Sequence, residues 1–283
     1  MNEVLEKHLT VSKNDQTLLD ILSENCPQIS KRKLKLAMKY GAVWLTPAKQ
    51  NTKTTRTQRA KKILQCGDQV HLYYNEAFLF SEVTPAKLIS DEGEYSVWNK
   101  PCGMLSQGTK WGAHTCITRW IEIFGLTLNR LPERPAFLVH RLDRATNGLI
   151  IVAHSKKAAR QLSNLFETRK VEKHYSAVVP GRFSVEPFSI LDSEVDGKQA
   201  LTIILSTKFN LQTNQTSVML KIETGRKHQI RKHLSEIGFA IVGDRLYAGI
   251  NADQLPDLML RSCYLNFICP FSNIEKAYRL DGY

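Results

Sequence analysis

Residues 140–153 read HRLDRATNGLIIVA, and this stretch decides how most of the chain is interpreted. Its last part, LIIVA at 149–153, is apolar and rich in β-branched residues, which predicts a buried strand. A shorter apolar run precedes it at 137–139. The polar residues in between therefore predict a loop that connects two buried strands and ends at Gly148.

That loop presents a single carboxylate, Asp143. Its basic neighbours are His140, Arg141 and Arg144. Nearby cations favour the ionised form of a carboxyl group, and an ionised Asp that is held in place can act as a nucleophile or a base. From the spacing alone, a structural Asp tied to the turn or to Arg144 fits the same pattern, and both interpretations stay open.

Further segments follow in an order that resembles a known family. They read KPCG at 100–103, KHYSA at 173–177, GKQALT at 197–202, TGRKHQIR at 224–231 and GDRLY at 243–247. Together with HRLDRATNGL they resemble the motifs of the RluA-type pseudouridine synthases. The chain departs from the family at Asn147, where Ser is usual, and at 261–270, where two His are replaced. The resemblance implies an α+β fold with a bent, mostly antiparallel sheet, flanking helices and an active cleft across the sheet.

Pseudouridine formation detaches uracil from C1′ of the ribose and reattaches it through C5, without redox change or net hydrolysis. The resemblance therefore implies neither a metal nor an organic cofactor. It assigns the catalytic carboxylate to Asp143, which either attacks C1′ or abstracts the 2′ proton. It makes Tyr175 the ring that packs on the target base, with a hydroxyl for the C5 proton step, and makes Arg231 the cation paired with Asp143. A core Tyr and an exposed helix Arg are the structural alternatives.

The target uridine has to leave its stack before it reacts. The resemblance implies that Arg141 occupies the vacated space and that His140 supports the loop. Further RNA contacts are expected from Arg144, from Lys100 as a structural or phosphate-binding residue, and from Arg226 as a phosphate contact.

Positive charge is concentrated near the N-terminus. Residues 31–62 hold eleven Lys or Arg and no Asp or Glu. Apolar residues at helical spacing within KRKLKLAMKYG predict a helix with Lys31, Arg32 and Lys35 off its apolar stripe. These three side chains are expected to bind RNA phosphates, although a solvated basic face fits the same pattern.

The region around this helix resembles the S4 RNA-binding module over roughly residues 16–75, with a departure at 44–46. In the RluA-type family such a module is a common N-terminal companion. We therefore expect a small α/β S4-like domain at 1–78, a linker at 79–94 and the catalytic domain at 95–283.

The composition is that of a folded protein with an anionic partner. The 283 residues are 42% hydrophobic and 23% charged, which excludes wholesale disorder, and the net charge is +12. The basic charge alone separates nucleic acid from a membrane surface poorly, but neither a secretory signal nor a membrane-spanning stretch is recognised, and no membrane partner is expected. The six Cys lack metal-binding spacing, which predicts no zinc site and reduced thiols in the cytoplasm. Nothing in the sequence requires more than a monomer.

The sequence thus predicts an isomerase, an RNA pseudouridine synthase. Large-subunit (23S) ribosomal RNA is the favoured substrate, since a structured RNA offers duplex phosphates to an S4-like module. A tRNA stem-loop is the alternative. Two other classes stay open, a non-catalytic RNA-binding or ribosome-assembly protein and a nucleosidase that releases free uracil. The presence of Asp143, Tyr175 and Arg231 argues against a protein that only binds.

Overall fold

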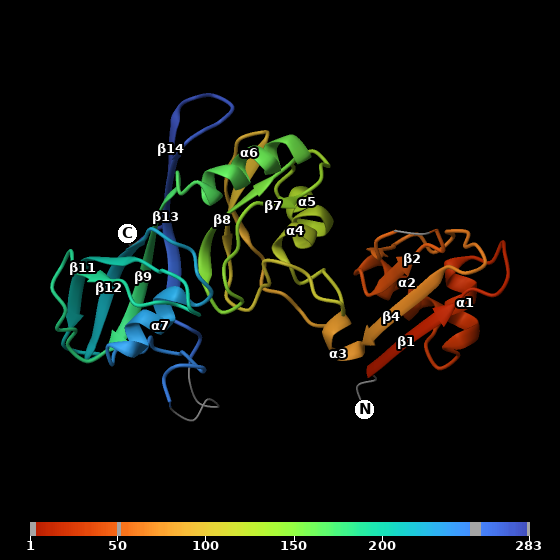
Figure 1. Ribbon diagram of the computed structural model, residues 1–283, viewed down its shortest axis with the longest axis horizontal. Coiled ribbons are helices and arrows are strands. Elements are labelled where there is room, and N and C mark those ends of the chain that lie inside the picture. The colour runs from red at the N-terminus through yellow and green to blue at the C-terminus, as the bar shows by residue number, and fades with distance from the viewer. Residues whose placement is uncertain (1–3, 50–51, 250–255, 282–283) are drawn as a thin grey trace. The chain divides into compact units, whose positions relative to one another are not determined.

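The computed structural model describes residues 4–49, 52–249 and 256–281. The chain divides into two compact units (Figure 1). The N-terminal unit holds the residues up to Val83 together with 107–123, and the C-terminal unit holds Thr84–Ser106 and the chain from Phe124 onward. Each unit has its own sheet and its own apolar core.

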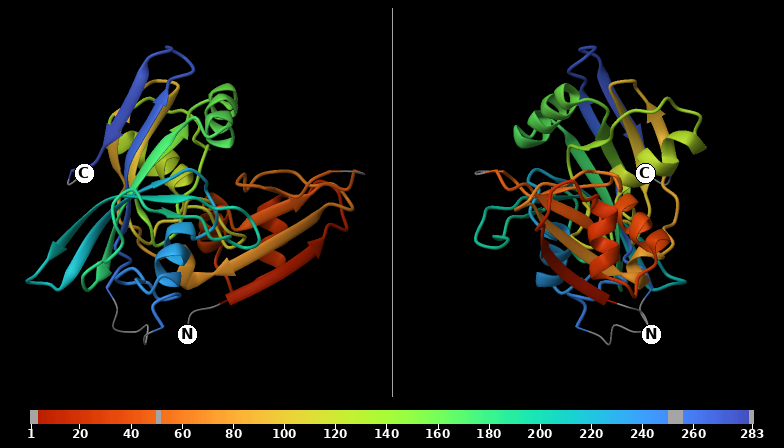
Figure 2. Two further views of the ribbon diagram at one scale, coloured as in Figure 1. Left: turned by 60° about the vertical axis from the view of Figure 1, so that its left-hand side comes forward. Right: turned by 90° about the vertical axis from the view of Figure 1, so that its right-hand side faces the viewer.

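The N-terminal unit is built on a four-stranded antiparallel sheet in the order β1-β4-β2-β3. Its strands are β1 (Val4–Thr10), β2 (Val43–Thr46), β3 (Thr55–Arg56) and β4 (Gln69–Asn75). Its helices are α1 (Leu18–Asn25), α2 (Lys31–Lys39), α3 (Glu76–Leu79) and α4 (Ile117–Trp120). Helices α1 and α2 lie against one face of the sheet (Figure 2). Sequence patterns do not predict strand β1.

Helix α2 forms where the sequence predicts it. The Ser30 hydroxyl caps its first turn by accepting a hydrogen bond from the Lys33 N–H at 3.3 Å. The apolar stripe of Leu34, Ala37 and Met38 is fully buried. The helix stops just before Gly41, which adopts a φ of +79° that glycine tolerates without steric cost.

Residues 107–123 interrupt the C-terminal unit in sequence but fold with the N-terminal unit. Thr109 and Gly112 close a tight turn through reciprocal backbone hydrogen bonds of 2.9 and 3.1 Å. The Arg56 guanidinium donates to the Thr109 carbonyl at 2.6 Å. The sequence predicts one continuous catalytic domain from residue 95 onward, but residues 107–123 fold with the N-terminal unit. Sequence order does not reveal which unit supplies the partners of this segment.

A ten-stranded, mostly antiparallel sheet forms the C-terminal unit. Its strands are β5 (Lys87–Asp91), β6 (Tyr95–Lys100), β7 (Phe137–Leu138), β8 (Asn147–Ala153), β9 (Glu172–Pro180), β10 (Ile190–Leu191), β11 (Thr202–Asn210), β12 (Gln215–Ile222), β13 (Leu260–Ile268) and β14 (Glu275–Arg279). The main path runs β10-β11-β12-β9-β13-β8-β6-β5, with β14 beside β13 and β7 beside β8. Among the described strands, only β13 and β8 pair in parallel. The predicted α+β class is confirmed, and β5 occupies part of the segment expected to be a linker.

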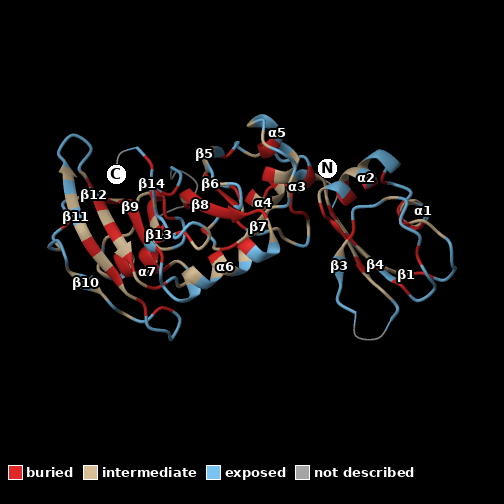
Figure 3. Cartoon of the chain, turned by 90° about the horizontal axis from the view of Figure 1, so that it is seen from above, coloured by how far each residue is buried: buried red, intermediate tan, exposed pale blue. Residues whose placement is uncertain are grey.

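Helical segments accompany the strands of this unit. They are η1 (Ile121–Gly125, a π-helical turn that begins in the N-terminal unit), α5 (Leu126–Leu128), α6 (Lys156–Glu167) and α7 (Gln229–Glu236). Helix α6 packs on β7 and β8 with Ala158 and Leu162 buried. Strand β8 is buried along nearly its whole length (Figure 3). Within the described ranges, no helix is both long and apolar enough to span a membrane.

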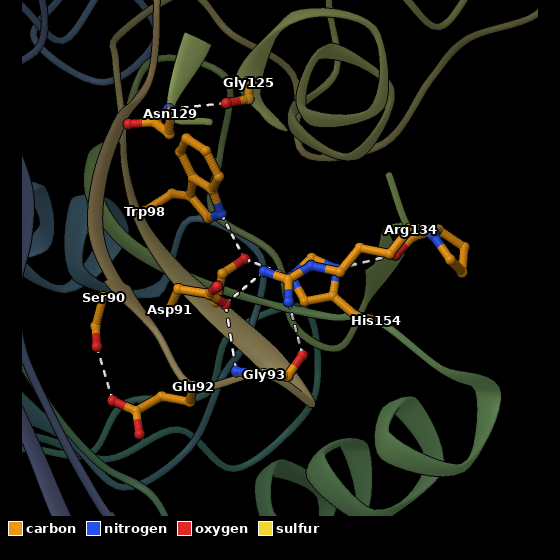
Figure 4. A network of polar contacts seen from close by, with 11 residues as sticks. Ser90, Asp91, Glu92, Gly93, Trp98, Gly125, Asn129, Arg134 and His154 are labelled. Carbon is orange, nitrogen blue, oxygen red and sulfur yellow. Dashed lines mark hydrogen bonds and ion pairs between the residues drawn. The ribbon is translucent and has the colours of Figure 1, made fainter. Parts of the chain in front are cut away.

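A polar network fixes the β5–β6 edge of the sheet (Figure 4). Arg134 pairs with the Asp91 carboxylate, and the His154 ring bonds the Ser96 hydroxyl at 2.8 Å and the Pro135 carbonyl at 2.9 Å. Burial lowers the pKa of His154, so the ring is neutral and has one N–H donor and one acceptor nitrogen. A neutral ring matches this pair of partners, because only the carbonyl requires a donor.

Candidate active site

The loop that carries Asp143 is fixed by the segment that follows β6. The Leu142 N–H donates to the Ser106 hydroxyl at 3.0 Å, and this hydroxyl donates to the Leu142 carbonyl at 2.6 Å. The Gly103 N–H donates to the Arg144 carbonyl at 2.9 Å. Backbone bonds on both sides of Asp143 therefore hold its Cα in place.

Lys100 holds the same loop from inside the protein. Its side chain is fully buried, and the ammonium donates to the carbonyls of Met104 at 2.9 Å, Pro101 at 3.1 Å and Arg144 at 3.4 Å. Burial lowers the pKa of Lys100 to about 8. The prediction that Lys100 binds RNA is wrong, because its ammonium is occupied by three carbonyls and is closed off from solvent. The alternative expectation, a structural role for Lys100, fits these contacts.

Gly148 ends the loop at a point where no side chain fits. Its φ is +114°, and a Cβ there would lie 2.2 Å from the Ser262 carbonyl oxygen on β13. The parallel pairing of β8 with β13 is made at this residue. The glycine therefore lets the strand after Asp143 enter the centre of the sheet.

His140 contacts the strand that follows the loop and the helix packed on it. Its Nε2 accepts a hydrogen bond from the Ile151 N–H at 2.9 Å, and its ring stacks on Phe166 with centroids 4.2 Å apart. Burial lowers the pKa of His140 to about 3, so the ring is neutral at physiological pH and Nε2 is free to accept. These contacts leave it a positioning role.

The motif at 224–231 turns into helix α7 around Gln229. The Gln229 Oε1 accepts from the Thr224 hydroxyl at 2.7 Å and from the Arg226 N–H at 3.0 Å. Its Nε2 donates to the Leu201 carbonyl at 3.0 Å. This buried amide ties the loop to the neighbouring strand and fixes the direction in which α7 starts.

Arg231 forms a buried ion pair, but not with Asp143. Its Nε and Nη2 donate to the two oxygens of Asp244, both at 2.7 Å. Although burial alone would lower it, the Asp244 carboxylate raises the pKa of Arg231, and Asp143 contributes to the same effect from farther away. The expected direct pair with Asp143 is thus wrong in its partner, because the sequence does not show that the turn at 243–247 folds back onto α7.

Asp244 is itself positioned by backbone. Its Oδ1 accepts from the Leu246 N–H at 3.0 Å and from the Tyr247 N–H at 3.1 Å. The preceding Gly243 has a φ of +82°, and a Cβ there would lie 2.4 Å from the Asp257 carbonyl oxygen. Burial raises the pKa of Asp244, but Arg231 and the two N–H groups outweigh it and lower the pKa overall.

His228 is a neighbour of Asp143 that sequence reasoning missed. Its Nε2 lies 3.8 Å from the Asp143 Oδ1, and its Nδ1 lies 2.9 Å from the Tyr247 hydroxyl. It sits at the N-cap of α7 in the left-handed region, with φ 57°. Burial lowers the pKa of His228, with Asp143 acting in the opposite direction. The signal is present in the T-G-R-K-H-Q-I-R motif, where this His lies three residues before Arg231.

Tyr175 lies on β9, opposite Leu220 on one side and Ser262 on the other. Its side chain is largely buried, with 9% of the residue exposed. Burial raises the pKa of Tyr175, and the negative charge of Asp143 acts in the same direction. The hydroxyl is therefore protonated at neutral pH.

A hollow of about 340 Å³ joins these elements. Five of the residues singled out from the sequence line it, namely Arg141, Asp143, Tyr175, Arg226 and Arg231. His228 lines it as well, and a quarter of the Asp143 side chain is exposed. Its size suits a small ligand or one nucleotide. Arg144 is exposed and donates to the Gly103 carbonyl at 3.2 Å.

The remaining predicted RNA contacts belong to the N-terminal unit. Lys31, Arg32 and Lys35 are exposed on α2, so they do not contribute to the walls of the hollow. Lys33 of the same helix pairs with Glu76 instead. Exposed cations on one helix suit contacts to phosphates rather than to a reacting base.

A carboxylate, a protonated phenol and a fixed guanidinium around one hollow can bind a planar polar base and act on the sugar beside it. The chain belongs to the RNA pseudouridylate synthase family, whose model matches residues 94–236. It is thus an isomerase, an RNA pseudouridine synthase of the RluA type.

Three relatives span most of the chain or much of it. An uncharacterised RNA pseudouridine synthase from Aquifex aeolicus is 29% identical and covers 92% of this chain and 84% of its own. The dual-specificity RNA pseudouridine synthase RluA from Haemophilus influenzae is 33% identical, covering 65% and 88%. The ribosomal large subunit pseudouridine synthase D from Borreliella burgdorferi is 31% identical, covering 63% and 60%.

A solved structure shares the fold. The human RNA pseudouridylate synthase domain containing 1 superposes with a TM-score of 0.54 at 23% identity, over 71% of this chain and 84% of its own. At this identity the likeness concerns the arrangement of the elements.

Proposed function

We propose that the hollow receives a uridine turned out of its RNA stack, and that Asp143 is the group that acts on its ribose. The observation that carries this assignment is the half-buried Asp143 carboxylate, held by backbone bonds on both sides and facing a hollow that Tyr175 and Arg231 also line. In this assignment Asp143 attacks C1′ or removes the 2′ proton.

In the same proposal Tyr175 places its ring against the uracil. Because its hydroxyl is protonated at neutral pH, Tyr175 is able to donate a hydrogen bond to the bound base. Its ring is rigidly mounted on a central strand, which suits stacking. A protonated hydroxyl cannot accept the C5 proton, so this proton passes to the Tyr175 oxygen only after the phenol has lost its own proton, or it passes to another base.

Arg231 and His228 supply the polar wall beside Asp143. Arg231 is fixed by both oxygens of Asp244, so its charge does not move when substrate enters. Arg141 is exposed at the edge of the hollow, where a long cationic side chain is able to fill the space that the uridine leaves. Arg226 lies on the opposite motif and is available to a phosphate.

As substrate we propose large-subunit ribosomal RNA, with tRNA as the second candidate. Exposed cations on α2 suit the phosphates of a structured RNA, and we interpret the N-terminal unit as an S4-like module. One relative is named for the ribosomal large subunit, which supports the first candidate. Another is named dual-specificity, which keeps the second open. We further propose a monomer that acts in the cytoplasm, where its six free cysteines stay reduced.

The test is release of tritium from RNA labelled at uridine C5. Wild type and the Asp143→Ala variant are compared on 23S ribosomal RNA and tRNA transcripts, offered separately. Release by wild type alone from the ribosomal transcript is the expected result. Release from tRNA alone would overturn the substrate, and equal release by the variant would overturn the role of Asp143. Free uracil among the products would indicate a nucleosidase instead.

A further inference from the structure

A second hollow lies beside the first in the C-terminal unit. Its volume is about 380 Å³, and it shares a wall with the first hollow. The shared wall is made by Arg141, Tyr175, Ile222, Gly225 and Arg226. A ligand longer than one nucleoside can therefore occupy both hollows at once.

Charge in the second hollow is mostly positive. Beyond the shared Arg141 and Arg226, its lining holds Arg169 and Lys173. The acidic side chains are Glu167 and Glu223. Glu223 is engaged elsewhere, since its Oε1 lies 2.8 Å from the Lys221 ammonium.

Lys173 is the unusual member of this lining. It is only 8% exposed, yet no hydrogen bond or ion pair joins its ammonium to any side chain or carbonyl in the part of the chain that the structure describes. Lys100, the other deeply buried lysine described above, has three carbonyl partners. Burial lowers the pKa of Lys173, and the charge of Glu223 offsets only part of that effect. A largely buried ammonium whose remaining exposure is to the hollow loses part of its hydration without gaining a partner, which is unfavourable for the free protein.

Its position in the strand directs it to the substrate. Lys173 and Tyr175 are two residues apart on β9, so their side chains leave the same face of the sheet. Tyr175 lines both hollows, and Lys173 lines the second. A phosphate attached to a uridine whose base packs on Tyr175 reaches the second hollow through the shared wall.

We propose that the second hollow is a phosphate subsite for the RNA strand, in which Lys173 pairs with a phosphodiester adjacent to the target uridine. This inference rests on the proposed placement of the uridine against Tyr175. In the complex, the substrate phosphate is the anionic partner that Lys173 lacks in the free protein. Part of the stability of the free enzyme is thereby exchanged for affinity in the complex.

Binding of uridine 3′,5′-bisphosphate and of unmodified uridine tests this, measured by calorimetric titration at low salt. We expect Lys173→Met to weaken binding of the bisphosphate about tenfold or more, the size of a lost charge-assisted hydrogen bond, and to leave binding of uridine unchanged. Lys170→Met is the matched control, because Lys170 is exposed and outside both hollows. It should bind both ligands as wild type does. Equal affinity of wild type and Lys173→Met for the bisphosphate overturns the proposal.

Thermal unfolding separates a subsite from a structural lysine. Met nearly matches the Lys stem and removes the unpaired charge, so the Tm of Lys173→Met should equal or exceed that of wild type. A lower Tm together with a loss of affinity for uridine overturns the proposal in favour of a structural role. Neither measurement needs turnover. If wild type releases tritium but Lys173→Met binds the bisphosphate as tightly as wild type does, the subsite alone is refuted. If Lys173→Met weakens binding of the bisphosphate but wild type releases no tritium, the proposed substrate alone is refuted.

Discussion

The hollow of the C-terminal unit and helix α2 of the N-terminal unit both carry charged side chains, but those of the hollow include a buried ion pair and those of α2 are exposed. In the hollow, Arg231 and Asp244 are buried and held by two 2.7 Å hydrogen bonds. On α2, Lys31 and Arg32 are exposed to solvent. Buried pairs hold a fixed geometry and are little affected by salt, whereas the attraction of exposed cations for phosphates is screened by salt. In our proposal the first region carries the chemistry and the second contributes affinity for RNA.

Loss of the reactive carboxylate gives the largest expected effect. Asp143→Asn should abolish turnover in the tritium-release assay while RNA affinity, measured by filter binding, stays within a few fold of wild type. The amide keeps the shape of the side chain but has neither the charge nor the basicity that the ribose step requires. Asp192→Asn, at an exposed position of the same unit, is the control and should retain turnover. Substantial turnover by a clean Asp143→Asn preparation would contradict the assignment.

Removing the buried partner of Arg231 should act on stability instead. Asp244→Asn leaves the guanidinium buried and without a charged partner, which is expected to lower the free energy of unfolding by about 3–5 kcal/mol. Urea denaturation measures the change. Asp143→Asn, at a partly exposed site, should change the same quantity by less than about 0.5 kcal/mol. If the two variants are equally stable, the division between a reactive and a structural carboxylate fails.

Acid should remove the same stabilisation gradually. The pKa of Asp244 is lowered in the folded protein, so its contribution is complete above the unfolded-state value of about 3.9 and is lost as the pH falls through the lower folded-state value. Wild type should therefore lose stability on acidification more steeply than Asp244→Asn, which has no carboxylate to protonate. Urea denaturation of both proteins from pH 7 downward checks the slope. Parallel pH profiles would show that Asp244 is not the group responsible.

The exposed region should give the smallest and most salt-dependent effect. Replacing Lys31, Arg32 and Lys35 together by Ala is expected to weaken RNA binding and to flatten its dependence on salt, by about 0.9 in logarithmic slope for each phosphate that is no longer neutralised. Turnover at saturating RNA should not change. An unaltered affinity and slope would reduce α2 to a solvated basic face, and the comparison between the two regions would no longer hold.

Local pattern is enough for several elements. The apolar residues before Ala153 predict β8, the spacing of Leu34, Ala37 and Met38 predicts α2, and the motifs locate Asp143, Tyr175 and Arg231, which line one hollow. Each of these inferences depends on neighbours in sequence or on a motif read as a unit.

Partners distant in sequence are beyond such reasoning. From its sequence context, Lys100 is a candidate for binding RNA phosphates. In the structure it is buried against three carbonyls, one of them 44 residues away. Residues 107–123 lie within the expected catalytic domain and fold with the other unit. Spacing does not reveal burial, and burial decides whether a charge faces RNA or a carbonyl.

The sequence by itself determined the family, the α+β class and the identity of the residues around the hollow. Only the tertiary structure decided which charges pair. It joined Arg231 to Asp244, placed His228 next to Asp143 and left Lys173 buried without a partner among the described residues. The reason is physical, because a side chain's identity fixes the charge it carries, whereas the free energy of that charge depends on the partners and the solvent that the fold brings to it.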